Sequence, residues 1–397
     1  MKTTPQSKYF DTDTLRLLRH GLTLSHRKGE WELESPEGRV LVLTSPAWRE
    51  VPQDMRKLVR AYTRDDDLVP IAKMRGGGAS ELRKFVDGRL VAPPRPVDGS
   101  ARGVVMAYVR AQIAALARAD LAVRQDLPDS VHRMRVAARR LRSVFGTYAT
   151  VLGGRKLLRE LNNSLRWLAG ELSPARDAEV QWARLDALAD WSAADAARMR
   201  IDEYFEAMTE DAKARVTAAL GSRRYVQLLD ALDVLEVVLS EEPRRRQPKV
   251  ARCPAGKVLP GLVRDVAAEV GDRVAGIEPG QARDLAVHDV RKSAKRLRYA
   301  IEAARGVLPV NVNGALERLR AFQDLLGEFQ DAVVAQAHLR ALATETSEDS
   351  YAVLRETEAE AANRCVEALP VAWQDVRADL SPLWTNPRKA GHSDAST

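Results

Sequence analysis

The hydrophobic and polar positions of residues 131–148, VHRMRVAARRLRSVFGTY, fall on two opposite faces of a helix at ~100° per residue. One face, an arc of about 120°, is apolar and is expected to be core. It holds Met134, Ala137, Ala138, Leu141, Val144, Phe145 and Tyr148. The opposite arc, about 80° wide, holds His132, Arg135, Arg139 and Arg142. The pattern predicts an amphipathic helix whose polar face is a stripe of basic side chains.

The chain repeats this pattern from Val287, where it reads VHDVRKSAKRLRYAIEAA. The two histidines are 156 residues apart (288 − 132), and Val, His, Arg, Ala, Arg, Leu and Arg recur at the same offsets. The apolar arc of this copy holds Val290, Ala294, Leu297, Ala300 and Ile301. Its polar arc holds His288, Arg291, Lys295 and Arg298, so each stripe spans about 15 Å. Because the cations recur with the apolar residues, we expect a duplicated site as well as a duplicated scaffold.

The two stripes have few acidic residues within their own sequence. Residues 131–148 contain no carboxylate, and residues 287–298 contain only Asp289, which points away from the stripe. A solvated helix face is the ordinary explanation of a charge run, but such a face usually mixes signs because like charges at i,i+3 and i,i+4 repel. Two cationic rows therefore favour a polyanionic ligand. The histidines have a second explanation, hydrogen bonding within the protein's own fold, which stays open.

A second duplicated element follows each stripe. Residues 168–172, LAGEL, precede Asp177, and residues 325–329, LLGEF, precede Asp331. Each glycine is expected near a helix end, and each aspartate is expected to cap the next helix. The helix before the first element carries Lys156, Arg159, Asn163 and Arg166 at the stripe spacing, and its counterpart carries Arg320. The basic members of this set, Lys156, Arg159, Arg166 and Arg320, are second-rank candidates for the same site.

Helical periodicity continues through most of the chain after residue 100. The predicted helices are 101–123, 131–148, 155–172, 174–189, 195–220, 222–240, 255–278, 282–307, 313–328, 330–345 and 349–369. Pro174 is expected to start a helix, and Pro309 and Pro370 are expected to break the pattern.

Residues 1–75 have a different pattern, with short alternating runs interrupted by Gly and Pro. The runs within 22–46 predict two or three strands, residues 54–62 a short helix, and residues 69–74 another strand. The expected organisation has six parts: a β segment at 1–75, a linker at 76–100 around one short helix, helical bundles at 101–242 and 255–384, a basic connector at 243–254 between them, and a disordered tail at 385–397.

Composition agrees with a basic helical protein. The 397 residues are 45% hydrophobic and only 5% aromatic, and the net charge of +7 points to an acidic partner. Cys253 and Cys365 lack metal-ligand spacing, which favours a reducing, cytoplasmic location. No signal peptide and no membrane-spanning run are expected.

The N-terminal segment resembles the front half of a CYTH domain, the triphosphate-tunnel fold. The matching residues are 9–12, 15–24 with Arg27, 29–33 and 68–72. The family's opening E-x-E-x-K strand is absent, Glu34 stands where a tunnel lysine is usual, and the later metal-binding carboxylates have no room before the linker. The resemblance therefore implies a partial, degenerate segment without triphosphatase activity.

Residues 100–380 resemble a CHAD domain, the conserved-histidine α-helical domain, on the pattern V-H-x-x-R-x-x-x-[RK]-R-L-R at both copies with its following L-x-G-E element. The resemblance implies two pseudo-symmetric antiparallel helical bundles and a mainly α fold. It also implies binding of inorganic polyphosphate, as a chain or a granule, in a basic groove between the bundles. The implied ligand-binding residues are His132, Arg135, Arg139, Arg142, His288, Arg291, Lys295 and Arg298.

Four functions were weighed on these residues. A non-catalytic polyphosphate-binding protein, which needs no cofactor, leads. A nucleic-acid binder is compatible with the charge, but no aromatic residues alternate with the stripe cations to stack on bases. A triphosphate or polyphosphate hydrolase needs metal-binding carboxylates, which the N-terminal segment lacks. A metal site on the two histidines ranks last, because the surrounding cations repel a metal ion.

Overall fold

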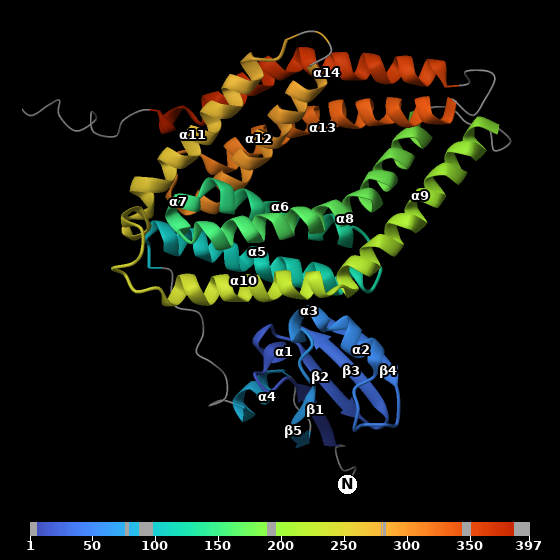
Figure 1. The fold of residues 1–397 in the computed structure, drawn as a ribbon, viewed down its shortest axis with the longest axis vertical. Coiled ribbons are helices and arrows are strands. Elements are labelled where there is room, and N and C mark those ends of the chain that lie inside the picture. Colours follow the sequence, from blue (N-terminus) through green and yellow to red (C-terminus); the bar gives the residue numbers. More distant parts are fainter. Residues whose placement is uncertain are drawn as a thin grey trace, which may run out of the picture. The chain divides into compact units, whose positions relative to one another are not determined.

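The chain is mainly α-helical, with one small antiparallel sheet near its N-terminus, in the computed structural model drawn in Figure 1. The structure describes residues 6–75, 79–86, 98–188, 196–278, 280, 283–343 and 351–384. This confirms the predicted fold class. The chain forms two compact units, Met1–Pro96 with Ile113–Met134, and Val97–Gln112 with Arg135–Thr397. The six-part organisation stays a prediction, and its tail at 385–397 lies outside the described residues, as do 76–78 and 87–97 of the linker.

The first unit is built on a five-stranded antiparallel sheet in the order β4-β3-β2-β1-β5. The strands are β1 (Gln6–Asp11), β2 (Thr23–Arg27), β3 (Glu30–Ser35), β4 (Gly38–Thr44) and β5 (Val69–Arg75). The short helices of this part are α1 (Arg16–Arg19), α2 (Gln53–Leu58), α3 (Arg60–Thr63) and α4 (Ala79–Phe85). The strands within 22–46 and at 69–74, the helical stretch at 54–62 and the short helix inside the predicted linker are all present.

Strand β1 is an element that the alternation pattern did not predict. Its residues Tyr9, Phe10 and Asp11 are buried in succession, and its register with β5 shifts between Tyr9 and Phe10. A bulge of this kind removes the strict alternation that marks a strand in a sequence. The Asp11 carboxylate accepts backbone N–H groups of Leu17 and Leu18, both at 2.9 Å, so it fixes the start of α1 against the sheet.

The second unit contains most of the helical repeat. Its longer helices are α5 (Ala101–Val123), α6 (Ser130–Thr147), α8 (Arg155–Leu188), α9 (Ala196–Gly221), α10 (Arg223–Glu241), α11 (Ala255–Ala275), α12 (Arg283–Ala304), α13 (Val312–Ala343) and α14 (Ala352–Asp379). Helix α5 ends in the first unit and α6 begins there. The shorter pieces are α7 (Ala149–Leu152), η2 (Lys249–Arg252), η3 (Arg305–Val307) and η4 (Ser381–Leu383). Helix α6 carries the first stripe and α12 the second.

Three helices are longer than predicted. Helix α8 runs through Pro174, α14 runs through Pro370, and α13 covers the two predicted helices 313–328 and 330–345. In α8 the buried stripe continues across the proline, from Leu168 and Leu172 to Ala175 and Ala178. Burial of a continuous apolar stripe outweighs the one backbone hydrogen bond that proline removes. The predicted breaks at Pro174, near Gly327 and at Pro370 are therefore wrong.

The apolar arcs of both copies form core, as predicted. All seven apolar positions of α6, and all five of α12, are at most 3% exposed. At their far ends, α8 and α9 share one hydrophobic cluster with α13 and α14. That cluster contains Ala178, Leu185, Ile201, Phe205, Ala335, Leu339, Leu342, Tyr351 and Leu354. The two halves of the helical repeat are thus joined through a common core.

No helix among the described residues is long and apolar enough to cross a membrane.

Candidate functional site

The two repeat helices α6 and α12 contact each other directly. The hydroxyl of Tyr148, in the turn that follows α6, donates to the Ala300 carbonyl at 2.8 Å, in a buried position. Within the first stripe, Arg139 Nε donates to the hydroxyl oxygen of Tyr299 at 3.0 Å. These bonds place the two polar stripes on adjoining surfaces rather than on opposite sides of the unit.

Four cations, two from each copy, gather where the stripes meet. Arg135 and Arg139 come from α6, and Arg291 and Lys295 come from α12. Burial first, and then repulsion from Arg139, Arg291 and Arg135, lower the pKa of the Lys295 ammonium to about 6, against an opposing effect of Asp331. Burial also lowers the pKa of the Arg291 guanidinium, and Arg139 and Arg135 add to that effect. That both copies contribute to one ligand-binding surface stays a prediction.

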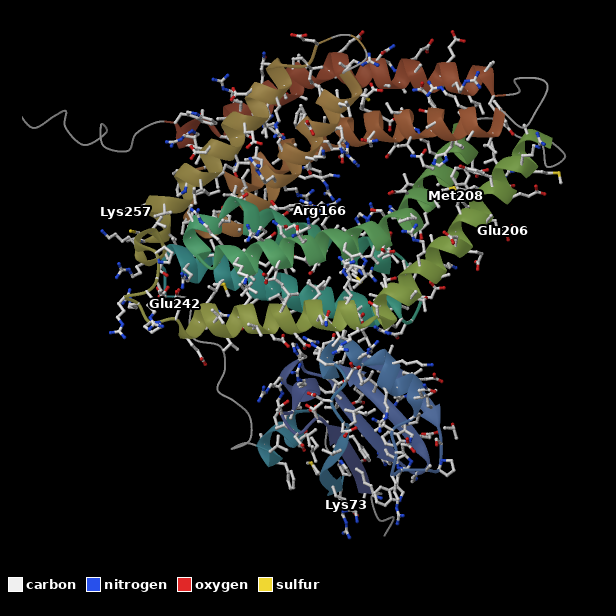
Figure 2. The ribbon with its side chains drawn as sticks, in the orientation of Figure 1. Lys73, Arg166, Glu206, Met208, Glu242 and Lys257 are labelled. Carbon is white, nitrogen blue, oxygen red and sulfur yellow. The ribbon has the colours of Figure 1, made fainter. Side chains whose placement is uncertain are left out.

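Arg142 and Arg166 extend this group along α6 and α8. The pKa of Arg142 is lowered by burial first, then by the neighbouring charges of Arg166 and Arg139. Arg166 lies on α8 in the region between the green and the orange helices (Figure 2). We call Arg135, Arg139, Arg142, Arg166, Arg291 and Lys295 the cationic cluster. All four second-rank residues are exposed. Arg166 joins the cluster through its effect on Arg142, whereas Lys156, Arg159 and Arg320 show no contact with it among the described residues.

Two carboxylates approach the cationic cluster from helices α8 and α13. Arg135 pairs with Asp177 at 3.1 Å and also donates to the Ser173 carbonyl at 3.4 Å. Asp331, the counterpart of Asp177 in the second repeat, acts on both Arg291 and Lys295. Burial raises the pKa of the Asp331 carboxyl group, although Arg291 opposes the shift.

The positions of these aspartates correct two expectations. Both residues lie inside helices rather than at their starts, so they are not helix caps. The charges of the stripes are also partly balanced by neighbouring helices. Asp177 pairs with Arg135, and Asp331 acts electrostatically on Arg291. The sequence marked these aspartates only as part of the second duplicated element, LAGEL before Asp177 and LLGEF before Asp331. That each aspartate lies near a stripe follows from the fold. Six basic side chains against these two carboxylates still leave an excess of positive charge.

Arg298, the last stripe residue of α12, is held by a separate ion-pair network. Its Nε donates to Glu302 at 3.1 Å and its terminal nitrogen donates to Gln323 at 3.3 Å. Glu302 also pairs with Arg140 at 3.0 Å and accepts the Tyr108 hydroxyl at 2.8 Å. The charge of Arg298 is thus largely balanced by Glu302 within the protein. The stripe spacing had predicted that Arg298, like Arg291, contacts the ligand.

The two histidines have different surroundings. His288 is half-buried, and its Nδ1 lies at hydrogen-bond distance, 2.9 Å, from Oε1 of Gln330. His132 is exposed in the first turn of α6. The sequence left open whether the histidines hydrogen-bond within the protein's own fold. For His288 the partner is Gln330.

Two arginines of the cationic cluster have unused hydrogen-bonding capacity. Within the described part of the chain, Nε of Arg142 and Nε of Arg291 are buried and lack a hydrogen-bond partner. A buried N–H without a partner is costly. Nε of Arg296, outside the cationic cluster, has the same property.

A pocket of about 390 Å³ lies elsewhere, between α8 and α9. Its walls are Glu179, Trp182, Asp202, Phe205, Glu206, Thr209 and Glu210. Glu206 is seen on α9 in Figure 2. Four carboxylates make this pocket unsuitable for a polyanion. The described residues contain no group of three or more His, Cys, Asp or Glu side chains placed to hold a metal ion.

Comparison with known proteins places these features in a family. The model of the CHAD domain matches residues 107–340. Two curated relatives, the uncharacterized proteins MT2285 and Rv2226 of Mycobacterium tuberculosis, are each 35% identical over 363 residues. The match covers 86% of this chain and 64% of each relative, so the chain spans less than two thirds of their length.

Two solved structures share the fold at 22% sequence identity. PptA from Streptomyces chartreusis superposes with a TM-score of 0.57, covering 69% of this chain and 99% of that protein. The CHAD domain from the plant Ricinus communis superposes with a TM-score of 0.54, covering 73% of this chain and 95% of that domain.

Proposed function

Because the chain belongs to the CHAD domain family, we propose that it binds inorganic polyphosphate and does so without catalysing a reaction. The family is linked to polyphosphate binding in general. The proposed binding surface is the cationic cluster, shared by α6 and α12 with a contribution from α8. In this proposal the cluster forms a basic groove between the two halves of the helical repeat.

The observation that carries the proposal is the meeting of Arg135 and Arg139 with Arg291 and Lys295. Polyphosphate is a linear chain with about one negative charge at every repeat unit, so cations from two neighbouring helices can contact consecutive phosphates. Arginine forks bind phosphate oxygens in pairs, whereas lysine acts as a compact point charge.

The surroundings of the cationic cluster favour phosphate over nucleic acid as the ligand. Tyr299 is the aromatic residue in contact with the cluster through Arg139, and its side chain is only 5% exposed. A ring buried to this extent presents no face on which a base can stack. Polyphosphate has no bases and needs only the charges.

The absence of catalysis is proposed on the chemistry of the nearest carboxylates. Asp177 is paired with Arg135, and Asp331 lies beside Arg291 and Lys295. These aspartates serve to position and balance the cations, and the stripes contain no nucleophile. For the first unit, the sheet β1–β5 and the CYTH-like residues support a degenerate element without triphosphatase activity. The ligand is proposed to be a free chain or granule in the cytoplasm.

A binding assay with matched variants tests this proposal. The site variant replaces Arg135, Arg139, Arg291 and Lys295 with Ala. The control variant replaces four exposed basic residues, Arg264, Lys292, Arg340 and Arg364, with Ala and therefore removes the same number of basic side chains. We expect the site variant to lose at least about 100-fold in affinity for long-chain polyphosphate, while the control loses less than about fivefold. Equal losses of affinity in the two variants would show that binding depends on net charge alone. A preference for DNA over polyphosphate in competition would favour a nucleic-acid binder.

A further inference from the structure

Lys295 differs chemically from the other members of the cationic cluster. A guanidinium keeps its proton in any protein environment, whereas a lysine ammonium loses its proton readily when buried among other cations. Lys295 lies on α12 one turn after Arg291 and is partly buried. Within the part of the chain that the structure describes, its amine has neither an ion pair nor a hydrogen bond.

The charges around this amine come from three helices. Helix α6 contributes Arg135 and Arg139, α12 contributes Arg291, and α13 contributes Asp331. Three guanidinium groups outweigh one carboxylate, and that carboxylate is itself less acidic than usual because burial raises its pKa.

Other charged groups nearby are engaged with different partners. Asp177 on α8 pairs with Arg135. Arg298 pairs with Glu302, and the His288 ring is bonded to Gln330. Burial first, and this imbalance of charge second, lower the pKa of Lys295 to about 6, so the amine of the free protein is mostly neutral at pH 7. A bound polyphosphate would change the balance, because each phosphate adds negative charge beside the amine.

Resting on the proposed function, we infer that polyphosphate binding is coupled to protonation of Lys295. As the phosphate chain arrives, the neutral amine takes one proton from solvent and becomes an ammonium that donates to phosphate oxygens. No bond other than this N–H forms or breaks, and the proton comes from water or buffer. The free protein thus avoids part of the repulsion between its own cations and acquires the full charge only with ligand.

This coupling has a defined pH dependence. Binding that takes up one proton strengthens by up to about tenfold for each unit by which pH falls. The increase extends from the pKa of the amine in the complex down to about pH 6 and levels off below pH 6, where the free amine is already protonated. Long-chain polyphosphate is used because it has few terminal phosphates, so their titration contributes little to the measured proton uptake.

The experiment is calorimetric titration of the full chain with long-chain polyphosphate at pH 7 and low salt, in buffers of different ionisation enthalpy. The slope of the observed heat against buffer ionisation enthalpy gives the number of protons taken up. The test variant is Lys295→Arg, whose side chain stays protonated. The control is Lys292→Arg, an exposed lysine of the same helix that pairs with Asp289 at 3.0 Å. We expect wild type and Lys292→Arg to take up about one proton more than Lys295→Arg.

The outcomes separate this inference from the proposed function. If wild type binds and takes up no more protons than Lys295→Arg, the coupling is wrong and the proposed function stands. If wild type shows no binding even at pH 6 and low salt, the proposed function fails and the inference fails with it. Since arginine is larger than lysine and could disturb folding, Lys295→Gln provides a second variant that should also lose the extra proton. NMR titration of the lysine side chains in the ligand-free protein measures the pKa of Lys295 independently. A Lys295 amine that stays protonated up to pH 9 would overturn the inference.

Discussion

Arg139 of the first repeat donates a hydrogen bond from its Nε to the hydroxyl oxygen of Tyr299 of the second repeat, at 3.0 Å. The tyrosine is 5% exposed, so its ring is fixed in the core while its hydroxyl reaches the cationic cluster. The guanidinium of Arg140 lies 5.6 Å from the centroid of the same ring. Tyr299 therefore orients arginines of one repeat from within the other.

Replacing Tyr299 with Phe removes this hydroxyl and leaves the ring in place. A hydrogen bond from a charged donor contributes about 1.5–3 kcal/mol, so we expect polyphosphate affinity to fall by about tenfold as Arg139 loses its orientation. Titration calorimetry measures the change. The control is Tyr204→Phe. The Tyr204 hydroxyl lies 3.0 Å from Nδ1 of His338, in the N-terminal part of α9 and outside the cluster. Unchanged affinity in Tyr299→Phe would mean that another group orients Arg139.

Replacing Lys295 with Met should stabilise the protein while weakening its binding. The folded-state pKa of about 6 lies below the ordinary lysine value of 10.5, so the unfolded chain binds more protons between these two pH values. Wild-type stability consequently rises with pH through that window, and the Met variant lacks this slope. We expect a gain of at least about 1 kcal/mol at pH 7, which shrinks towards pH 10.

Urea denaturation at pH 6, 7, 8 and 9 measures this effect. Lys292→Met, on the exposed side of the same helix, is the control and should change stability by less than about 0.5 kcal/mol. A Met variant that is less stable than wild type at pH 7 would show that the amine is well accommodated in the free protein.

Arg184 tests the ion-pair network that joins the two halves of the repeat. It donates to Glu358 at 2.6 Å and to Glu328 at 2.7 Å, and the Glu358 side chain is fully buried. Arg184→Met leaves that carboxylate without its partner, so we expect a loss of about 3–5 kcal/mol in the free energy of unfolding. The matched control, Arg364→Met, breaks an exposed pair with Glu360 and should cost less than about 1 kcal/mol. Equal effects in thermal or urea denaturation would contradict a structural role for the buried pair.

Salt dependence reports how many cations contact phosphate. By analogy with nucleic acid, each lost contact should reduce the slope of log affinity against log salt by about 0.7–0.9. Arg139→Ala and Arg291→Ala should each lower the slope by about this amount, whereas Arg264→Ala on the exposed side of α11 should leave it unchanged. A slope that falls equally in all three variants would indicate attraction by net charge alone.

The sequence predicted the features that depend on helical periodicity. The buried positions of α6 and α12 follow from apolar spacing alone, because burial of one face is set locally by the period of the helix. The basic stripes follow from the same spacing. The continuous helices through Pro174 and Pro370 could not be predicted, since their stability comes from packing against helices distant in sequence.

The partners within the site were also beyond prediction. Asp177 lies 42 residues after Arg135, and Tyr299 lies 160 residues after Arg139. No spacing rule connects such pairs, because their contact depends on how helices cross in the folded unit. The same holds for Arg298, whose stripe position matches that of Arg142 while its charge is paired with Glu302. Sequence spacing therefore identified candidates, and tertiary contacts distinguish the cluster from the residues that serve the fold.

One shared site is the claim on which the proposed function depends most, and half-site variants test it directly. Arg135→Ala with Arg139→Ala removes two cations of the first repeat, and Arg291→Ala with Lys295→Ala removes two of the second. Calorimetry with a short polyphosphate of defined length should give one site per wild-type chain, and each half-site variant should weaken binding to that single site by at least about 30-fold. Two equivalents bound by wild type, with each half-site variant retaining one equivalent at wild-type affinity, would contradict the shared site.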